Sequence, residues 1–369
     1  MSKRDRDSYA SAGVDYSVLD RVKQLAQGQA RGTSGRLAMT GAREVEASRG
    51  ETAYVVDMGD HYLATVLECL GTKSLVADAM RPHLGRSSYD RIARDAVAAI
   101  VNDLAAVGAQ PLIVNAYFAA GSAAWFADEE RAGDLIHGWA EACREAGAAW
   151  GGGESPSLRG IVEPDAIDLA GSAVGVVRPK ERLVTAEKLR PGDAIVLVAS
   201  SGIHANGLSL ARRTAAELPQ GYLAPLPDGR PLGDALLDPS PLYSNLVREA
   251  QEAGVDVHYL IHITGHGWRK LMRAERNLTY VIDHLPDVPP VLAFLAEAAG
   301  LSDEEAYGTF NMGAGFAFYV APEQAPAVVD VAHRHGVSAL IAGRVEEGSR
   351  RVIIQPKGIE YHEDSLRIR

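Results

Sequence analysis

A glycine-rich turn with polar side chains is the segment of this sequence best suited to binding an anion. Residues 199–207 read Ala-Ser-Ser-Gly-Ile-His-Ala-Asn-Gly and lie between an apolar run and an amphipathic helical pattern. Backbone N–H groups at the start of a helix attract anions, and glycine lets the chain turn sharply before them. Because Ser201, His204 and Asn206 add side-chain donors, we expect this turn to bind a phosphate. The alternative is an ordinary helix cap.

Oxygen ligands on one helical segment could hold a divalent cation. Residues 88–107 repeat apolar residues at helical spacing. Asp95 and Asn102 are two helical turns apart and share a face, with Asp103 beside them. Such ligands suit Mg²⁺, which also binds substrate phosphates. A solvated helix face is the alternative.

Three further segments combine glycines with polar residues. Residues 150–155 place three glycines before a carboxylate at the end of an expected strand, and residues 67–73 follow another strand with a carboxylate, a glycine and a lysine. Glycine permits the close approach of a ligand, although residues 309–315 also fit a β-bulge. The candidate residues here are Glu68, Gly71, Thr72, Lys73, Gly152, Gly153, Glu154 and Asn311.

Histidines at 258, 262 and 266 repeat every four residues, which invites a metal-site interpretation. The surrounding text, VHYLIHITG, alternates as a strand does, so helical zinc spacing is the wrong template. We expect these histidines to face solvent or the edge of a substrate site.

Composition excludes several classes of protein. The chain has 369 residues, 47% hydrophobic and 23% charged, which is typical of a folded two-domain protein. Its net charge is 37 − 48 = −11, which disfavours a nucleic-acid or anionic-membrane partner. Two cysteines and an N-terminus without an apolar signal region predict a cytoplasmic protein, and no apolar run is long enough to span a membrane.

The order of patterns predicts an α/β fold in two domains. We expect a mobile flap at 1–50, an N-terminal domain at 51–180 with a mixed sheet, and a C-terminal α/β domain at 181–369, the charged segment near 180 marking the boundary. Expected strands are 54–58 and 61–68, joined as a hairpin at Gly59-Asp60, then 111–116, 167–177 and 194–199; expected helices are 16–26, 88–107, 131–146 and one from Leu208 to Leu218.

In order, eight pieces of the sequence resemble the aminoimidazole ribonucleotide (AIR) synthetase family, the phosphoribosylformylglycinamidine cyclo-ligases of purine biosynthesis. These pieces span nearly the whole chain, and their colinearity is more specific than any one motif. They are SYASAGVD near the start, LGTK at 70–73, VNDLAAVGAQPL at 101–112, GGE at 152–154, DLAGSAVGVV at 168–177, ASSGIHANGLSLARR at 199–213, HITGHG at 262–267 and TFNMGAG at 309–315.

The resemblance implies a homodimer associated through its N-terminal sheets and an ATP- and Mg²⁺-dependent ring closure of formylglycinamidine ribonucleotide. It assigns Asp103 to metal binding and catalysis and Glu154 to catalysis at the nucleotide–metal end. It assigns His204 and Asn206, with Ser201, to the substrate phosphate, and Asn311 to a structural or substrate-lining role. The remaining expectations are Asp95 and Glu68 as further metal ligands, and Glu68, Gly71, Thr72, Lys73, Asn102, Gly152 and Gly153 as the nucleotide site.

The sequence departs from the family pattern at its substrate edge. Glu68-Cys69 replaces aspartate-glycine, Ala10 replaces a lysine, His266 replaces a glycine and Gly308 replaces an arginine. These changes leave two alternatives: a divergent ATP-dependent enzyme for another phosphorylated or amide substrate, and a catalytically silent nucleotide-binding dimer. Selenophosphate synthetase, the hydrogenase-maturation dehydratase and thiamine-phosphate kinase share the architecture but match the motifs less well.

Overall fold

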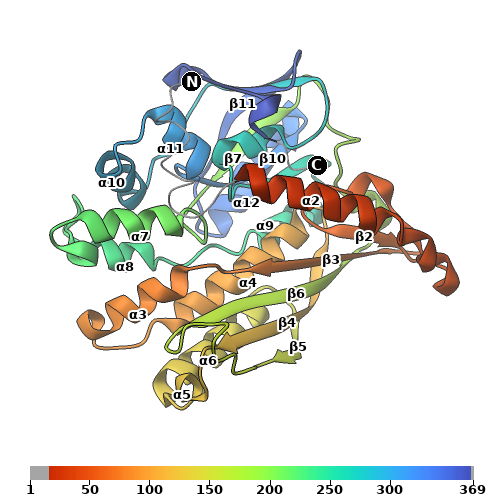
Figure 1. The fold of residues 1–369 in the computed structure, drawn as a ribbon. Helices are drawn as coiled ribbons and strands as arrows, with labels where there is room; N and C mark the ends of the chain where they lie inside the picture. Colours follow the sequence, from red (N-terminus) through yellow and green to blue (C-terminus); the bar gives the residue numbers. More distant parts are fainter. Residues whose placement is uncertain (1–15, 367–369) are drawn as a thin grey trace.

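The protein, described here from a computed structural model over residues 16–366, contains two β-sheets with helices packed against them (Figure 1). The N-terminal sheet has the strand order β1-β2-β3-β6-β4-β5. Its strands are β1 (Arg43–Glu44), β2 (Tyr54–Asp57), β3 (Tyr62–Cys69), β4 (Gln110–Ala120), β5 (Ala149–Glu154) and β6 (Ile167–Val177), and its helices are α3 (Lys73–Leu84), α4 (Tyr89–Ala105), α5 (Ala123–Phe126) and α6 (Glu129–Glu145).

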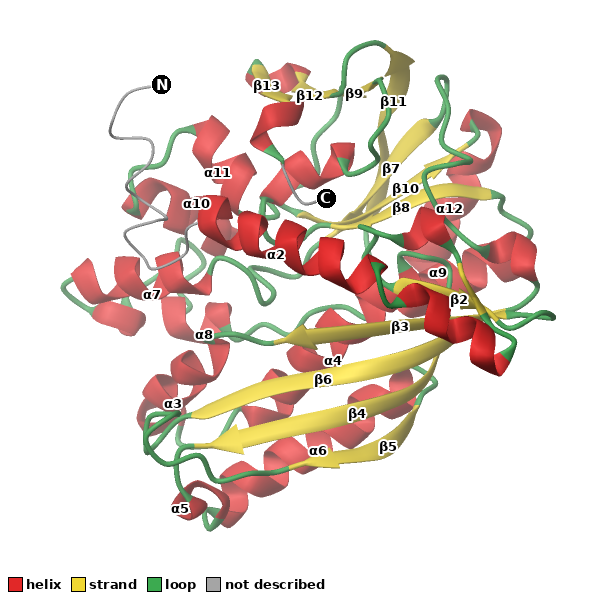
Figure 2. Ribbon diagram, turned by 45° about the vertical axis from the view of Figure 1, so that its right-hand side comes forward, coloured by secondary structure: helices red, strands yellow, loops and turns green. Residues whose placement is uncertain are grey.

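Among residues 16–366, helices cover one face of the N-terminal sheet and leave the other face bare. Helices α4 and α6 lie behind the strands in Figure 2, and α4 packs on β3, β4 and β6. Residues of β6 alternate between buried and partly exposed along its length, as expected when only one face meets the core. The bare face carries apolar side chains, among which Leu67 is 74% exposed.

The C-terminal sheet has the order β13-β12-β9-β11-β7-β10-β8, and its strands β8, β9 and β10 are buried at every residue. Its strands are β7 (Ala194–Ala199), β8 (Val257–His262), β9 (Leu278–Ile282), β10 (Ala314–Val320), β11 (Ala339–Glu347), β12 (Arg351–Ile354) and β13 (Ile359–His362). The helices of this half are α7 (Leu208–Glu217), α8 (Leu232–Leu236), α9 (Ser244–Glu252), α10 (Pro290–Ala298), α11 (Asp303–Thr309) and α12 (Ala325–Arg334).

Buried polar contacts fasten the two halves together. The ammonium group of Lys73 lies 2.6 Å from the Asp95 carboxylate, and both side chains are fully buried. Ser240 donates to Asp95 from its backbone N–H and its hydroxyl group, while the Asn102 amide donates to Pro241 O at 2.9 Å. Because an unpaired buried charge is costly, these contacts hold α3 and α4 against the segment before α9.

The structure confirms the α/β class and the principal elements expected from the sequence. The hairpin, the strands 167–177 and 194–199, and the helices at 89–105, 129–145 and 208–217 all form. Helix α2 (Tyr16–Arg31) is longer than the expected helix at 16–26 and crosses the molecule beside β3 (Figure 2). The mobility of the flap stays a prediction, as do the domain boundaries. Within residues 16–366, no helix is both long and apolar enough to cross a bilayer.

Candidate active site

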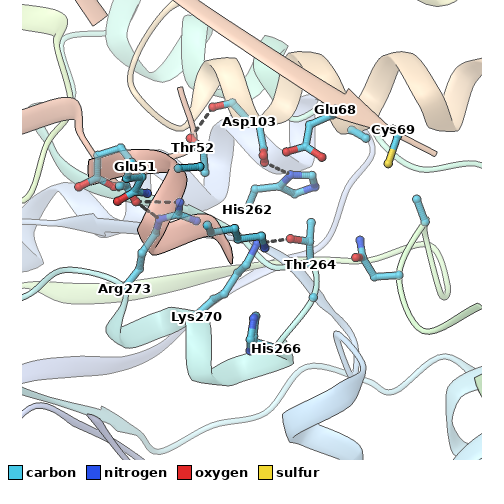
Figure 3. A pocket seen from close by; sticks show the side chains of 18 residues that line it. Glu51, Thr52, Glu68, Cys69, Asp103, His262, Thr264, His266, Lys270 and Arg273 are labelled. Carbon is cyan, nitrogen blue, oxygen red and sulfur yellow. Dashed lines mark hydrogen bonds and ion pairs between the residues drawn. The ribbon is translucent and has the colours of Figure 1, made fainter. Parts of the chain in front are cut away.

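A pocket of about 500 Å³ lies where the two halves meet (Figure 3). Its walls come from α2, residues 50–52, the end of β3, the last turns of α4, the glycine turn at 205–206 and the segment from β8 through the 3₁₀ helix Gly267–Met272. The pocket therefore collects residues from most of the segments that the sequence singled out. Its functional side chains include an acidic wall (Glu68 and Asp103) and a basic wall (Lys270 and Arg273).

Asp103 is held in the acidic wall by two elements of the fold. His262 Nδ1 lies 2.6 Å from a carboxylate oxygen of Asp103, and the Thr52 hydroxyl donates to the Asp103 backbone carbonyl. Burial opposes ionisation of this carboxyl, but the hydrogen bond and charge of His262 and the charges of Lys270 and Arg273 outweigh it and lower the pKa. Asp103 is therefore a fixed carboxylate that faces the pocket.

Glu68 completes the acidic wall from the end of β3. Burial, and then the negative charge of Asp103, raise the pKa of Glu68 to about 8, and the two carboxyl groups share a hydrogen bond. Two carboxyl groups this close compete for one proton, and a divalent cation would relieve that repulsion. Glu68 and Asp103 therefore fit Mg²⁺.

The remaining ligands of such a cation would have to come from outside the protein. No group of three or more His, Cys, Asp or Glu side chains in residues 16–366 is arranged to hold a metal ion. A site with two carboxylates matches the behaviour of Mg²⁺, which keeps waters and binds phosphate oxygens together with one or two carboxylates.

The basic wall faces these carboxylates. Lys270 is 8% exposed, and its ammonium group donates to the Thr264 hydroxyl. Burial lowers the pKa of Lys270 to about 8 against the opposing charge of Asp103. Arg273 donates to Gly50 O at 2.8 Å and 3.1 Å. Thus the pocket offers a site for a cation on one side and donors for an anion on the other.

His258 and His262 lie in strand β8, as the alternation predicts, whereas His266 lies beyond the strand, directly before the 3₁₀ helix. His258 and His262 do not face solvent: β10 pairs with β8, and the two rings contact the carboxylates of Asp193 and Asp103. His262 and His266 line the pocket, which agrees with the expectation of a substrate edge.

Asp95, Asn102 and Lys73 lie outside this pocket. Their polar groups bind one another, Ser240, Pro241 and Asp238 O in the contacts between the two halves. The same face of α4 thus carries two functions: its last turn presents Asp103 to the pocket, and its middle carries Asp95 into the interior.

The glycine turn contributes unequally to the pocket. Asn206 lines it, whereas Ser201 donates to Pro239 O and His204 is 3% exposed with a left-handed backbone, φ 58°. Burial, and then the charges of His262 and Lys73, hold the pKa of His204 well below its ordinary value, so the ring is neutral. His204 Nε2 accepts from the Ser201 N–H at 3.3 Å.

Asn311 lies just before β10 and holds this turn in place through its side chain. Its side chain accepts from Ser200 Oγ at 2.7 Å and from Gly313 N at 3.1 Å, and donates to Gly202 O at 2.7 Å. Because each side-chain bond holds backbone or a neighbouring hydroxyl, the arrangement favours the structural alternative for Asn311.

The other two predicted glycine segments of the N-terminal half lie on different strands of its sheet. Gly71 and Thr72 form the turn from β3 into α3. Gly152, Gly153 and Glu154 lie on β5, and Glu154 is exposed. Since β6 and β4 separate β5 from β3, one chain does not bring Glu154 to the pocket.

The departures from the family pattern have local structural counterparts. Gly308 leaves room for Arg269, because a side-chain carbon at 308 would lie 2.4 Å from the Arg269 guanidinium. His266 takes a left-handed conformation, φ 71°, and burial with the Lys270 charge lowers its pKa to about 3. Ala10 lies outside the described residues.

Sequence reasoning did not assign Thr264, Lys270 or Arg273 to the site. Thr264 lies within the HITGHG piece at 262–267, and Lys270 and Arg273 follow that piece directly, so their closeness to it was the available signal.

Two family models match the chain. The model described as "AIR synthase related protein, N-terminal domain" matches residues 50–177, and that described as "AIR synthase related protein, C-terminal domain" matches residues 190–355. Together these matches cover every strand of both sheets except β1 and β13.

Curated relatives match over nearly the whole length. A protein of Methanococcus maripaludis named phosphoribosylformylglycinamidine cyclo-ligase is 32% identical over 92% of both chains. One of the same name from Lachnospira eligens is 32% identical over 94% of this chain and 99% of its own, and one from Methanothermobacter thermautotrophicus is 38% identical over 76% and 79%.

Solved structures share the fold at lower identity. A chain of a HypE-HypF complex is 18% identical with a TM-score of 0.60, covering 86% of this chain and 94% of its own. AaThiL complexed with AMPPCP and TMP is 16% identical with a TM-score of 0.56, covering 85% and 90%.

Proposed function

The chain belongs to the AIR synthase related family, whose curated relatives are ligase-type enzymes, and we propose that it converts formylglycinamidine ribonucleotide into aminoimidazole ribonucleotide with ATP and Mg²⁺. The observation that carries the proposal is the pocket in which Asp103 and Glu68 face Lys270 across the junction of the two halves. Such a pocket can bind a metal–phosphate complex and shield it from water.

The proposed reaction has two steps. First, the amide oxygen of the substrate attacks the γ-phosphorus of ATP; an O–P bond forms, the bond to the β–γ bridging oxygen breaks, and ADP leaves with the electron pair. Then the amine nitrogen of the same molecule attacks the activated carbon. A C–N bond forms, phosphate leaves with the C–O electron pair, and the nitrogen loses a proton.

The residues divide this work by charge. Asp103 and Glu68 would hold Mg²⁺, which neutralises charge on the ATP phosphates when bound. His262 fixes the orientation of the Asp103 carboxylate through its 2.6 Å contact. Asn206 and the backbone of the glycine turn would bind the ribose 5-phosphate, with Ser201 and His204 shaping the turn behind them.

The proposal includes a homodimer that works in the cytoplasm. The bare apolar face of the N-terminal sheet is the surface on which a second copy would pack, because exposed apolar faces of this kind mark association sites. Glu154 lies at the edge strand of that sheet and could join a nucleotide site only through such an association.

The test uses purified protein, ATP, Mg²⁺ and formylglycinamidine ribonucleotide. We expect equal amounts of ADP and aminoimidazole ribonucleotide, and no product from the dephosphorylated substrate at the same concentration. The control omits Mg²⁺. ATP binding without product would contradict the cyclo-ligase assignment and favour the silent nucleotide-binding dimer; ADP release only with another amide would favour the divergent enzyme.

A further inference from the structure

Lys270 is a buried cation in the middle of the candidate active site. It lies in the 3₁₀ helix Gly267–Met272, is 8% exposed, and donates one hydrogen bond to the Thr264 hydroxyl (Figure 3). A lysine ammonium has three N–H donors. Burying an ammonium group costs free energy unless opposite charge compensates it, so its place in a pocket of about 500 Å³ calls for an anionic partner.

The other two cations of the pocket are less suited to that partner. The guanidinium of Arg273 already donates two hydrogen bonds to Gly50 O and lies 3.8 Å from the Glu51 carboxylate. Arg273 therefore holds residues 50–51 in place. Lys23 is exposed on α2, and its long side chain would have to be ordered on binding. Lys270 is the cation that the fold holds in place before a ligand arrives.

The carboxylates opposite Lys270 are assigned to a different task. Asp103 and Glu68 act on the Lys270 ammonium through their charge. If both bind Mg²⁺, as proposed, their charge is no longer available to the lysine. The phosphate oxygens that enter with the metal then become the natural partners of its N–H groups.

We propose that Lys270, together with the Thr264 hydroxyl, contacts an oxygen of the phosphoryl group during its transfer. The inference rests on the proposed function.

Lys270 forms no covalent bond in this role. As the γ-phosphoryl group moves from the β–γ bridging oxygen of ATP to the amide oxygen, negative charge persists on its non-bridging oxygens and grows on the leaving ADP. A preorganised ammonium stabilises that charge more in the transition state than in the bound substrate. Its removal should therefore lower kcat more than it raises KM for ATP.

The experiment compares Lys270→Met with the wild type and with Lys188→Met, which removes a surface lysine bound to Asp256. Methionine keeps most of the volume and removes the charge, so the fold should survive, and the melting temperature of each variant checks this. We expect kcat of Lys270→Met to fall about 10²–10³-fold, with KM for ATP within about threefold, because this is the usual cost of one preorganised donor. Lys188→Met should behave as wild type.

Two results would overturn the proposal. One is a kcat of Lys270→Met within about threefold of wild type, and the other is a rise in KM for ATP without a fall in kcat.

The wild-type enzyme separates the two proposals. If wild type forms neither ADP nor aminoimidazole ribonucleotide, the proposed function fails. If wild type is active and Lys270→Met is equally active, only the role of Lys270 fails.

Discussion

The two sheets of this protein differ in how much of their surface the chain itself covers. In the N-terminal sheet, helices cover one face and the other stays open, whereas strands β8, β9 and β10 of the C-terminal sheet are buried throughout. The N-terminal sheet therefore leaves an apolar face for the proposed second copy, whereas these strands of the C-terminal sheet are covered by the chain itself.

The pocket shows the same division in its charges. The acidic wall comes from β3 and α4 of the N-terminal half, and the basic wall from the segment after β8 of the C-terminal half. Neither wall could hold a metal–phosphate complex alone. The relative placement of the halves is therefore part of the catalytic design.

Breaking the buried ion pair that joins α3 and α4 at the junction of the two halves should have the largest effect. Lys73→Met removes the partner of Asp95 and leaves a buried carboxylate with only the Ser240 donors. We expect the free energy of unfolding to fall by about 3–5 kcal/mol, the usual cost of breaking a buried ion pair. Urea denaturation measures it.

The control is Lys188→Met, whose partner Asp256 is solvent-exposed. An exposed pair contributes about 0–1 kcal/mol. Equal losses for the two variants would show that the buried Lys73–Asp95 ion pair contributes no more to stability than an exposed pair.

Removing the Asp103 carboxylate from the acidic wall should have the second-largest effect. Asp103→Ala should lower kcat about 10²–10³-fold, because it removes a fixed charge that would hold Mg²⁺. Steady-state kinetics with varied Mg²⁺ measures the loss. Unchanged kinetics in a folded variant would contradict the metal assignment.

A charge on the bare face should weaken association. Leu67→Lys places an ammonium on the open face, where apolar packing against a second copy is expected. We expect the dimer dissociation constant to rise about 10- to 100-fold, the range for one or two tenfold steps of about 1.4 kcal/mol. Light scattering checks this, and a wild-type mass of 39.3 kDa at all concentrations would remove the dimer.

The sequence predicted helices and strands better than it predicted which side chains contact each other. Strands 167–177 and 194–199 were predicted with their observed bounds because their apolar patterns and flanking turns are local. Asp103, which was singled out because it interrupts an apolar helix face, lines the pocket, and its role in metal binding stays a prediction. Asp95 has the same local signal, yet its partner Ser240 lies 145 residues away, so no spacing rule separates the two aspartates.

Lys270 was missed for a related reason. Lysine is rarely buried, so a sequence pattern predicts an exposed side chain. Lys270 is buried because the two halves meet around it, and this arrangement is visible only in the structure.

The smallest expected effect concerns Glu68 and depends on pH. In the unfolded chain its carboxyl ionises near the ordinary pKa of 4.5, and in the folded protein near 8. Between these values the folded state binds more protons than the unfolded state, so this group lowers stability as pH rises through the window. Glu68→Gln should therefore stabilise the ligand-free protein by about 1–3 kcal/mol more at pH 8.5 than at pH 5.5.

Glu145→Gln is the matched control, because the Arg94 hydrogen bond lowers the pKa of Glu145 and keeps it ionised in both states throughout that range. Its stability difference from wild type should not change with pH. If Mg²⁺ and nucleotide occupy the acidic wall, they should stabilise wild type more than Glu68→Gln at pH 8.5, since the cation replaces the shared proton. If the stability difference between Glu68→Gln and wild type did not change with pH, the acidic wall would hold no such proton. The two halves would then differ less in charge than the geometry indicates.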